Sequence, residues 1–221
     1  MTARPSEHAA GYDRADIARR YDEIAADYAA RLGDDPPAGS GDRAFVEVAL
    51  ASAQGNGPVL DLGCGPGQIA AIAVASGMRA VGADISAAML AIARRRVRDG
   101  AFLAAEAWAL PLRTASCRAV AAFYCLHHVS RAWIGIVLGE SRRVLGAGGT
   151  LIVATHLGSG EQWVTGPDPS DATPICVTLY GRDELAAEVR GAGFAIESVG
   201  TRAPRPDEFQ AEHGFLRARA A

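Results

Sequence analysis

The feature that most constrains the fold is an apolar run that leads into a glycine-rich turn. Residues 58–68 are PVLDLGCGPGQ, with Gly63, Gly65 and Gly67 at alternate positions, and a second apolar run ends at Asp84. A continuous apolar run indicates a buried parallel strand, and glycines let the chain turn tightly so that a ligand can approach the backbone. The sequence therefore predicts a Rossmann-like α/β sheet with a nucleoside site at the ends of its first two strands.

The glycine spacing narrows the choice of cofactor. A dinucleotide fingerprint has its third glycine three positions after the second, and Gln68 occupies that position. With Asp61 in front, VLDLGCGPGQ resembles the first motif of class I S-adenosylmethionine-dependent methyltransferases, and GADISAAMLAIARRR resembles their second strand and helix. The resemblance favours the small-molecule branch typified by ubiquinone and menaquinone biosynthesis enzymes (type 11), with S-adenosylmethionine as the cofactor and S-adenosylhomocysteine as its product.

Alternating patterns along the chain predict the remaining elements. Helices are expected over 13–31, 42–54, 68–77, 86–99, 130–145 and 182–192, and strands over 58–62, 79–83, 101–105, 119–123, 150–155, 194–199 and near 214–218. This order predicts an α/β fold with helices on both faces of a mostly parallel sheet. The resemblance implies a seven-stranded sheet whose last strand is antiparallel, a lid region over 1–40 and a methyltransferase domain over 41–221.

Composition limits the partners. The net charge is −3, and the one dense basic run, Arg94 to Arg96 with Arg98, falls on a predicted helix surface, so no nucleic-acid partner is expected. The four cysteines form no C-x-x-C pair, and neither a metal site nor a disulfide framework is expected. Without an apolar signal core or a membrane-length run, we expect a cytoplasmic monomer or homodimer.

The resemblance assigns cofactor roles to residues of three segments. It implies that Asp61, Gly63, Cys64, Gly65 and Gly67 hold the methionine portion, that Asp84 binds the ribose, and that Ile85 and Met89 line the adenine side. Glu106 and Ala107 would bind the adenine, and Trp108, Tyr124 and Tyr21 would complete the wall. Three alternatives stay open: Asp61 ties down loop N–H groups, Glu106 is a solvated strand end, and Trp108 covers a core edge.

The reaction is expected beyond the carboxyl ends of the parallel strands, where the fourth strand leads into His127 and His128. Methyl transfer is an in-line displacement that depends mainly on alignment in a dry pocket. An oxygen or nitrogen acceptor that carries a proton would benefit from a neutral imidazole as base, which makes His127 and His128 the candidate catalytic residues. The alternative is that this Leu-His-His string is purely structural.

Acceptor specificity is expected from the amino-terminal helix and the late loops. Tyr21 and Tyr28 share a helix face, and RYDEIAADYAARLG resembles the lid helix of small-molecule methyltransferases, although core packing explains the same spacing. Tyr28, His128, His156 and Trp163 are the predicted acceptor contacts, with Gln162 and His213 nearby. His156, Gln162, Trp163 and His213 are expected in loops that wall the cavity.

These observations leave three hypotheses. The leading one is transfer of a methyl group from S-adenosylmethionine to a small organic acceptor. The second is a protein of this fold that has lost transfer, or that uses the bound sulfonium for another reaction. The third is a nicotinamide-dependent oxidoreductase, which Gln68 and the EAWALP segment disfavour.

Overall fold

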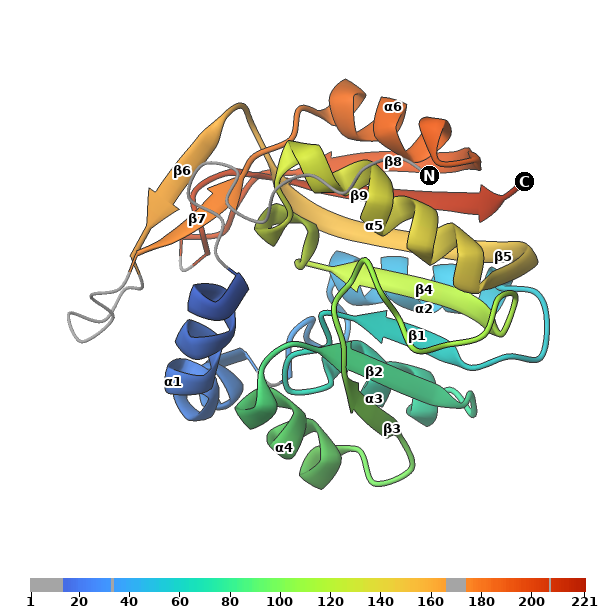
Figure 1. The fold of residues 1–221 in the computed structure, drawn as a ribbon, viewed down its shortest axis with the longest axis horizontal. Helices are drawn as coiled ribbons and strands as arrows, with labels where there is room; N and C mark the ends of the chain where they lie inside the picture. Colours follow the sequence, from blue (N-terminus) through green and yellow to red (C-terminus); the bar gives the residue numbers. More distant parts are fainter. Residues whose placement is uncertain (1–13, 33, 166–173, 207) are drawn as a thin grey trace.

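The computed structural model describes residues 14–32, 34–165, 174–206 and 208–221. Its central sheet has seven strands (Figure 1): β1 (Val59–Leu62), β2 (Ala80–Asp84), β3 (Ala101–Ala104), β4 (Cys117–Phe123), β5 (Leu145–Leu157), β8 (Phe194–Arg202) and β9 (Glu212–Ala220). They lie in the order β3-β2-β1-β4-β5-β9-β8. β1 to β5 pair in parallel, and β9 is antiparallel to both β5 and β8. The predicted fold, with an antiparallel last strand, is confirmed.

Two layers of helices cover the sheet because its central strands are apolar on both faces. On one face, α5 (Arg131–Val144) and α6 (Arg182–Gly191) pack against β1, β4, β5 and β9. On the other face, α2 (Gly41–Ser52) and α3 (Gln68–Ala75) pack against β1, β4 and β5. All four residues of β1 are buried, as expected for a strand in the middle of a doubly covered sheet.

The turn after β1 depends on glycine. Gly63 has a φ of 65°, and a Cβ there would lie 2.4 Å from the Cβ of Cys125. Gly65 has a φ of 48°, and its Cβ would have only the Gln68 side chain within 4 Å. The first glycine therefore allows the turn to pass close to the end of β4, and the second leaves open space beside the backbone.

The amino-terminal helix α1 (Arg14–Leu32) lies beyond the carboxyl ends of β1 and β4 (Figure 1). It packs against α4 (Ala87–Arg96), which follows β2. A 3-10 turn, η1 (Leu126–His128), follows β4 at the same end of the sheet. This arrangement encloses the sheet edge at which α/β proteins bind ligands.

Two expectations about the late part of the chain need correction. Residues expected to form a loop after β5 include a hairpin of β6 (Glu161–Val164) and β7 (Ile175–Thr178). His156, Trp163 and His213 were expected in loops, but they lie in β5, β6 and β9. The helix predicted from residue 13 begins at Arg14 in the described residues, and residue 13 lies outside them.

Candidate functional site

A cavity lies between helix α1 and the carboxyl ends of β1, β2 and β4. It encloses about 1120 Å³ with its open mouth included. Its walls contain almost all the residues predicted to contact the cofactor, namely Tyr21, Asp61, Gly63, Cys64, Gly65, Asp84, Ile85, Met89, Glu106, Ala107, Trp108 and Tyr124. Gly67 is not among the lining residues and instead begins α3 with a φ of 85°.

Asp61 has a structural role that is visible in its contacts. Its Oδ2 accepts a hydrogen bond of 2.9 Å from the backbone N–H of Ala70, which ties the first turn of α3 to β1. Burial raises the pKa of the Asp61 carboxyl to about 8, and the hydrogen bond from Ala70 opposes that shift. Asp61 therefore accepts a bond from a neighbouring N–H group, as one of the alternatives from the sequence proposed. The same side chain also lines the cavity.

Asp84 is held firmly at the end of β2. Its Oδ2 accepts from the N–H of Gly65 at 2.8 Å, and its Oδ1 accepts from the N–H of Ser86 at 2.9 Å. Burial raises the pKa of Asp84, while the hydrogen bonds from Ser86 and Gly65 act in the opposite direction. The carboxylate is thus oriented by the glycine turn and by the start of α4, with its side chain on the cavity wall.

The adenine side of the predicted site holds an ion pair that sequence reasoning missed. Arg14, in the first turn of α1, pairs with Glu106, and both residues line the cavity. Trp108 packs against Trp133 with ring centroids 4.7 Å apart, so it joins the core edge and the cavity wall at once. Arg14 carries no sequence signal because only the placement of α1 brings it to Glu106.

Helix α1 is fastened over the cavity at several points. Tyr21 Oη lies 2.7 Å from His128 Nε2, and the ring of Tyr28 packs edge-on at 6.0 Å from that of Tyr21. Asp22 Oδ1 accepts from Ser86 Oγ at 2.6 Å and from the N–H of Ala88 at 2.9 Å, at the start of α4. The helix predicted as a lid therefore lies over the cavity and is held there by side chains that reach both η1 and α4.

The two predicted catalytic histidines have different surroundings. His128 lines the cavity, whereas His127 is buried and does not line it. The centroids of the two imidazole rings are 4.1 Å apart. Burial lowers the pKa of His128 to about 4, with neighbouring His156 as the second cause, and burial also lowers the pKa of His127. Both imidazoles are thus neutral near pH 7, and only His128 reaches the space where an acceptor would lie.

The other two predicted acceptor contacts do not line the cavity. His156 lies between His127 and His213, at centroid distances of 5.1 and 4.8 Å. Burial lowers the pKa of His156 to about 4, and the next cause is His213. Trp163 is 62% exposed on the hairpin strand β6.

Tyr124, which follows β4, also lines the cavity. Tyr124 has a φ of 54°, a conformation that non-glycine residues seldom adopt and that is enriched at functional sites. Its N–H donates to Ala154 at 2.7 Å, and its Oη lies 2.5 Å from His213 Nδ1. Burial raises the pKa of the Tyr124 phenol, with Asp42 as the second cause.

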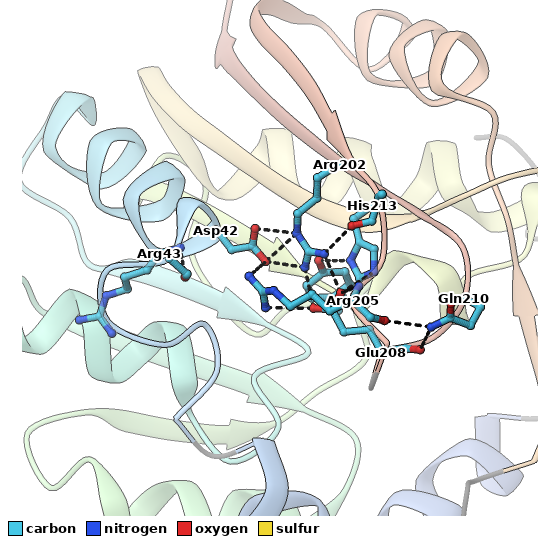
Figure 2. Close-up of polar contacts among 10 residues, drawn as sticks. Asp42, Arg43, Arg202, Arg205, Glu208, Gln210 and His213 are labelled. Atoms are coloured by element: carbon cyan, nitrogen blue, oxygen red, sulfur yellow. Dashed lines mark hydrogen bonds and ion pairs between the residues drawn. The ribbon is translucent and has the colours of Figure 1, made fainter.

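Behind His213 lies a network of charged side chains (Figure 2). Arg202 Nη2 donates to Asp42 Oδ2 at 2.6 Å and to Glu208 Oε1 at 2.7 Å. Hydrogen bonds to Glu208 and Asp42 raise the pKa of Arg202, and the bond from Arg202 lowers the pKa of Glu208 to about 2. The sequence could not predict this network, because Asp42 and Arg202 are 160 positions apart and come together only when α2 packs beside the end of β8.

Comparison with known proteins agrees with this geometry. A family model described as a methyltransferase domain matches residues 59–149. A demethylmenaquinone methyltransferase from Beutenbergia cavernae is 37% identical over 142 residues, which cover 63% of this chain and 54% of that protein. Residues 59–149 therefore match a methyltransferase domain, and the chain has the fold of S-adenosylmethionine-dependent methyltransferases. The match thus spans about half the length of that relative.

Solved structures resemble this methyltransferase domain in fold. The [4+2]-cyclase SpnF has a TM-score of 0.71 at 20% identity, over 92% of this chain and 95% of its own. The geranyl diphosphate C-methyltransferase of Streptomyces coelicolor A3(2) has a TM-score of 0.65 at 15% identity, over 97% and 91% of the two chains. That enzyme was solved with Mg²⁺, geranyl diphosphate and S-adenosylhomocysteine.

The residues of this methyltransferase domain fit its cofactor, S-adenosylmethionine. The backbone at Gly65 borders open cavity space that a Cβ would enter, and the adjacent Asp84 carboxylate keeps lone pairs available for hydroxyl donors. The described residues contain no cluster of three or more His, Cys, Asp or Glu side chains suited to a metal ion. Within the same residues, no helix has the length and apolarity needed to cross a bilayer.

Proposed function

We propose that this protein transfers the methyl group of S-adenosylmethionine to a small organic acceptor held beneath α1. The observation that carries the proposal is the continuity of one cavity, which runs from Asp84 and the glycine turn to the aromatic side chains of Tyr21, Tyr28 and Tyr124. A pocket walled by tyrosines and closed by a helix suits a compact, partly apolar molecule. Macromolecular acceptors need an open and extended surface instead.

The cofactor roles predicted from the motifs form part of this proposal. Asp84 binds the ribose hydroxyls, the turn with Gly63 and Gly65 lies along the methionine portion, and Glu106 with Ala107 binds the adenine. When bound, S-adenosylmethionine supplies an electrophilic methyl group on a sulfonium. Helix α1 acts as a lid, which excludes water and aligns the acceptor, and such alignment is the main requirement of a displacement.

Binding measurements test the cofactor assignment first. Calorimetry on cofactor-stripped protein compares S-adenosylmethionine, S-adenosylhomocysteine and NADH. We expect binding of the two sulfur nucleosides alone, and a loss of affinity of at least about 100-fold in Asp84→Ala, because a positioned carboxylate is lost from a buried site. NADH binding alone would support the oxidoreductase hypothesis, and normal binding by Asp84→Ala would remove the ribose role.

An acceptor screen then tests transfer. Phenols, alcohols, amines, thiols and demethylmenaquinone, the acceptor in the name of the 37% identical relative, are incubated with S-adenosylmethionine, and S-adenosylhomocysteine release is measured. The similarity in fold to a [4+2]-cyclase supports one alternative, a protein that binds the cofactor and catalyses another reaction. Tight cofactor binding with no release of S-adenosylhomocysteine to any acceptor would favour that alternative.

A further inference from the structure

Three side chains form a line that leads from the cavity to the charged network. Tyr124 lines the cavity, and its Oη lies 2.5 Å from Nδ1 of His213. On the other side of the same imidazole ring, Nε2 of His213 lies 3.4 Å from Oε2 of Glu208. His213 is 2% exposed, so its ring exchanges protons with these two neighbours more readily than with bulk water.

The direction of the hydrogen bonds follows from the chemistry of the end groups. Nε2 of His213 is buried without a hydrogen-bond partner among the described residues, and its contact with Glu208 at 3.4 Å is electrostatic. An ionised carboxylate attracts a proton to the nitrogen that faces it, so Nε2 is the nitrogen that carries the proton. A neutral imidazole has one donor and one acceptor nitrogen, which leaves Nδ1 as the acceptor. The Tyr124 hydroxyl therefore donates to Nδ1, and the lone pairs of its oxygen remain available to a group in the cavity.

Glu208 is fixed in an ionised and oriented state. Its carboxylate accepts from Arg202 at 2.6 and 2.7 Å and from the backbone N–H of Arg205 at 2.7 Å. Arg202 in turn is bound by Asp42, which is only 4% exposed (Figure 2). Paired arginine–carboxylate bonds of this kind fix orientation as well as charge.

The groups facing His213 come from several elements. Tyr124 follows β4, His156 lies on β5, Arg202 on β8, and Arg205 and Glu208 lie between β8 and β9, with Asp42 behind them. Burial is the main cause that lowers the pKa of His213, followed by Arg202, whereas Glu208 raises it. The ring is thus neutral at rest, and the carboxylate stabilises the imidazolium once a proton arrives.

We propose that Tyr124, His213 and Glu208 form a proton-accepting triad, and that the acceptor is therefore an O–H or N–H compound. This inference rests on the proposed function. Tyr124 is the catalytic residue, because it is the member of the triad that lines the cavity. His213 and Glu208 are positioning residues that act through it.

The triad accounts for every proton and electron pair of the transfer. The acceptor's proton moves to Tyr124 Oη while the phenol proton moves to His213 Nδ1, and His213 is left as an imidazolium beside Glu208. The electron pair freed on the acceptor forms the new bond to the methyl carbon, and the pair of the broken carbon–sulfur bond stays on sulfur. After product release, the imidazolium gives its proton back through Tyr124 to solvent.

Nitrogen-15 NMR of the histidines in the complex with S-adenosylhomocysteine tests the geometry without any acceptor. We expect His213 to be neutral at pH 7 with its proton on Nε2, and Tyr124→Phe to remove the hydrogen-bond shift at Nδ1. We expect Glu208→Gln to lower the pKa of His213, since the carboxylate raises it. A proton on Nδ1, or a Tyr124→Phe spectrum with unchanged His213 shifts, would overturn the triad.

Steady-state kinetics with the acceptors found in the screen tests whether the triad acts in the transfer reaction. We expect Tyr124→Phe to lower kcat about 100-fold, with S-adenosylhomocysteine affinity unchanged within about twofold. In Glu208→Gln the acid limb of kcat/KM moves to lower pH and the plateau falls, which a purely structural role would not produce. The matched control is Glu197→Gln, which removes the ion pairs of Glu197 on β8 with Arg217 and Arg219 on β9. We expect this control to leave the acid limb and the plateau of kcat/KM unchanged.

The outcomes separate the two proposals. A wild-type protein that does not bind S-adenosylhomocysteine refutes the proposed function, whatever the His213 spectrum shows. A protein that binds it and methylates acceptors, yet keeps its full rate in Tyr124→Phe or prefers carbon or sulfur nucleophiles, refutes the triad alone.

Discussion

Two tyrosine–histidine pairs each place a tyrosine on the cavity wall, and their surroundings differ. Tyr21 and His128 join helix α1 to η1 at 2.7 Å, whereas Tyr124 and His213 join the segment after β4 to β9 at 2.5 Å. His128 is backed by the imidazoles of His127 and His156, which disfavour a second positive charge. His213 is backed by Glu208, which favours one.

The comparison teaches that the same pair of side chains can serve two purposes. A pair between a helix and a turn, with no carboxylate among the contacts described for its histidine, is suited to holding a lid shut. A pair between strands, supported by an ordered carboxylate, is suited to taking up a proton. The histidines predicted as catalytic from the sequence belong to the first environment, and their role as base stays a prediction that the following experiments decide.

The largest expected difference is kinetic. We expect His213→Gln to lower kcat for an O–H acceptor about 100-fold, since it removes the group that receives the phenol proton, and His128→Gln to lower it less than about fivefold. Single-turnover transfer measured for both variants at saturating S-adenosylmethionine makes the comparison. The reverse order of effects would return the role of base to His128.

A smaller effect concerns the pH dependence of stability and depends on His156, which lies between the two pairs. Its pKa of about 4 in the folded protein is below its ordinary value of 6.5, so the unfolded chain takes up the proton first. Its presence therefore costs stability as pH falls from about 6.5 towards about 4, by roughly 1 kcal/mol at pH 5 after allowing for partial exposure. Urea unfolding of wild type and His156→Phe at pH 7 and pH 5 measures this. An equal stability difference at both pH values would mean that His156 keeps an ordinary pKa.

The lid pair predicts an effect on binding rather than on chemistry. We expect Tyr21→Phe to weaken S-adenosylhomocysteine about fivefold, since one buried hydrogen bond contributes about 1 kcal/mol to the closed lid. Calorimetry beside Tyr124→Phe, which should leave this affinity unchanged, gives the contrast. Equal weakening by the two variants would mean that both pairs hold the cofactor site together.

The smallest predicted effect concerns the second fastening of the lid. Asp22→Ala removes the acceptor for Ser86 and for the N–H of Ala88, and we expect the free energy of unfolding to fall by about 1 kcal/mol. In a chain of this length that lowers the Tm by roughly 2–4 °C. The control is Asp27→Ala, an exposed acid on the same helix, which should leave the Tm unchanged. A similar loss in both variants would indicate a general effect of charge on α1.

Much of the site was predictable because its signals are local. The glycine turn, Asp84 at the end of β2 and the EAW segment at 106–108 are short strings whose geometry follows from a few neighbouring residues, and all of them meet at the cavity. The helix carrying Tyr21 and Tyr28 was predictable from its spacing for the same reason. The alternation of elements likewise predicted the parallel sheet, and the resemblance to methyltransferases implied the antiparallel position of its last strand.

The tertiary structure alone decided which polar groups oppose one another. Residues 156 and 213 were expected in loops, and they become neighbours because β5 and β9 pair in one register. The pairing of β8 with β9 brings Arg202 beside His213, and Glu208 then lies 3.4 Å from Nε2 of the His213 ring. Sequence patterns record which face of an element is apolar, but not which distant strand lies beside it. The sequence therefore predicted which residues line the cavity, whereas the fold decided which histidine has a carboxylate behind it.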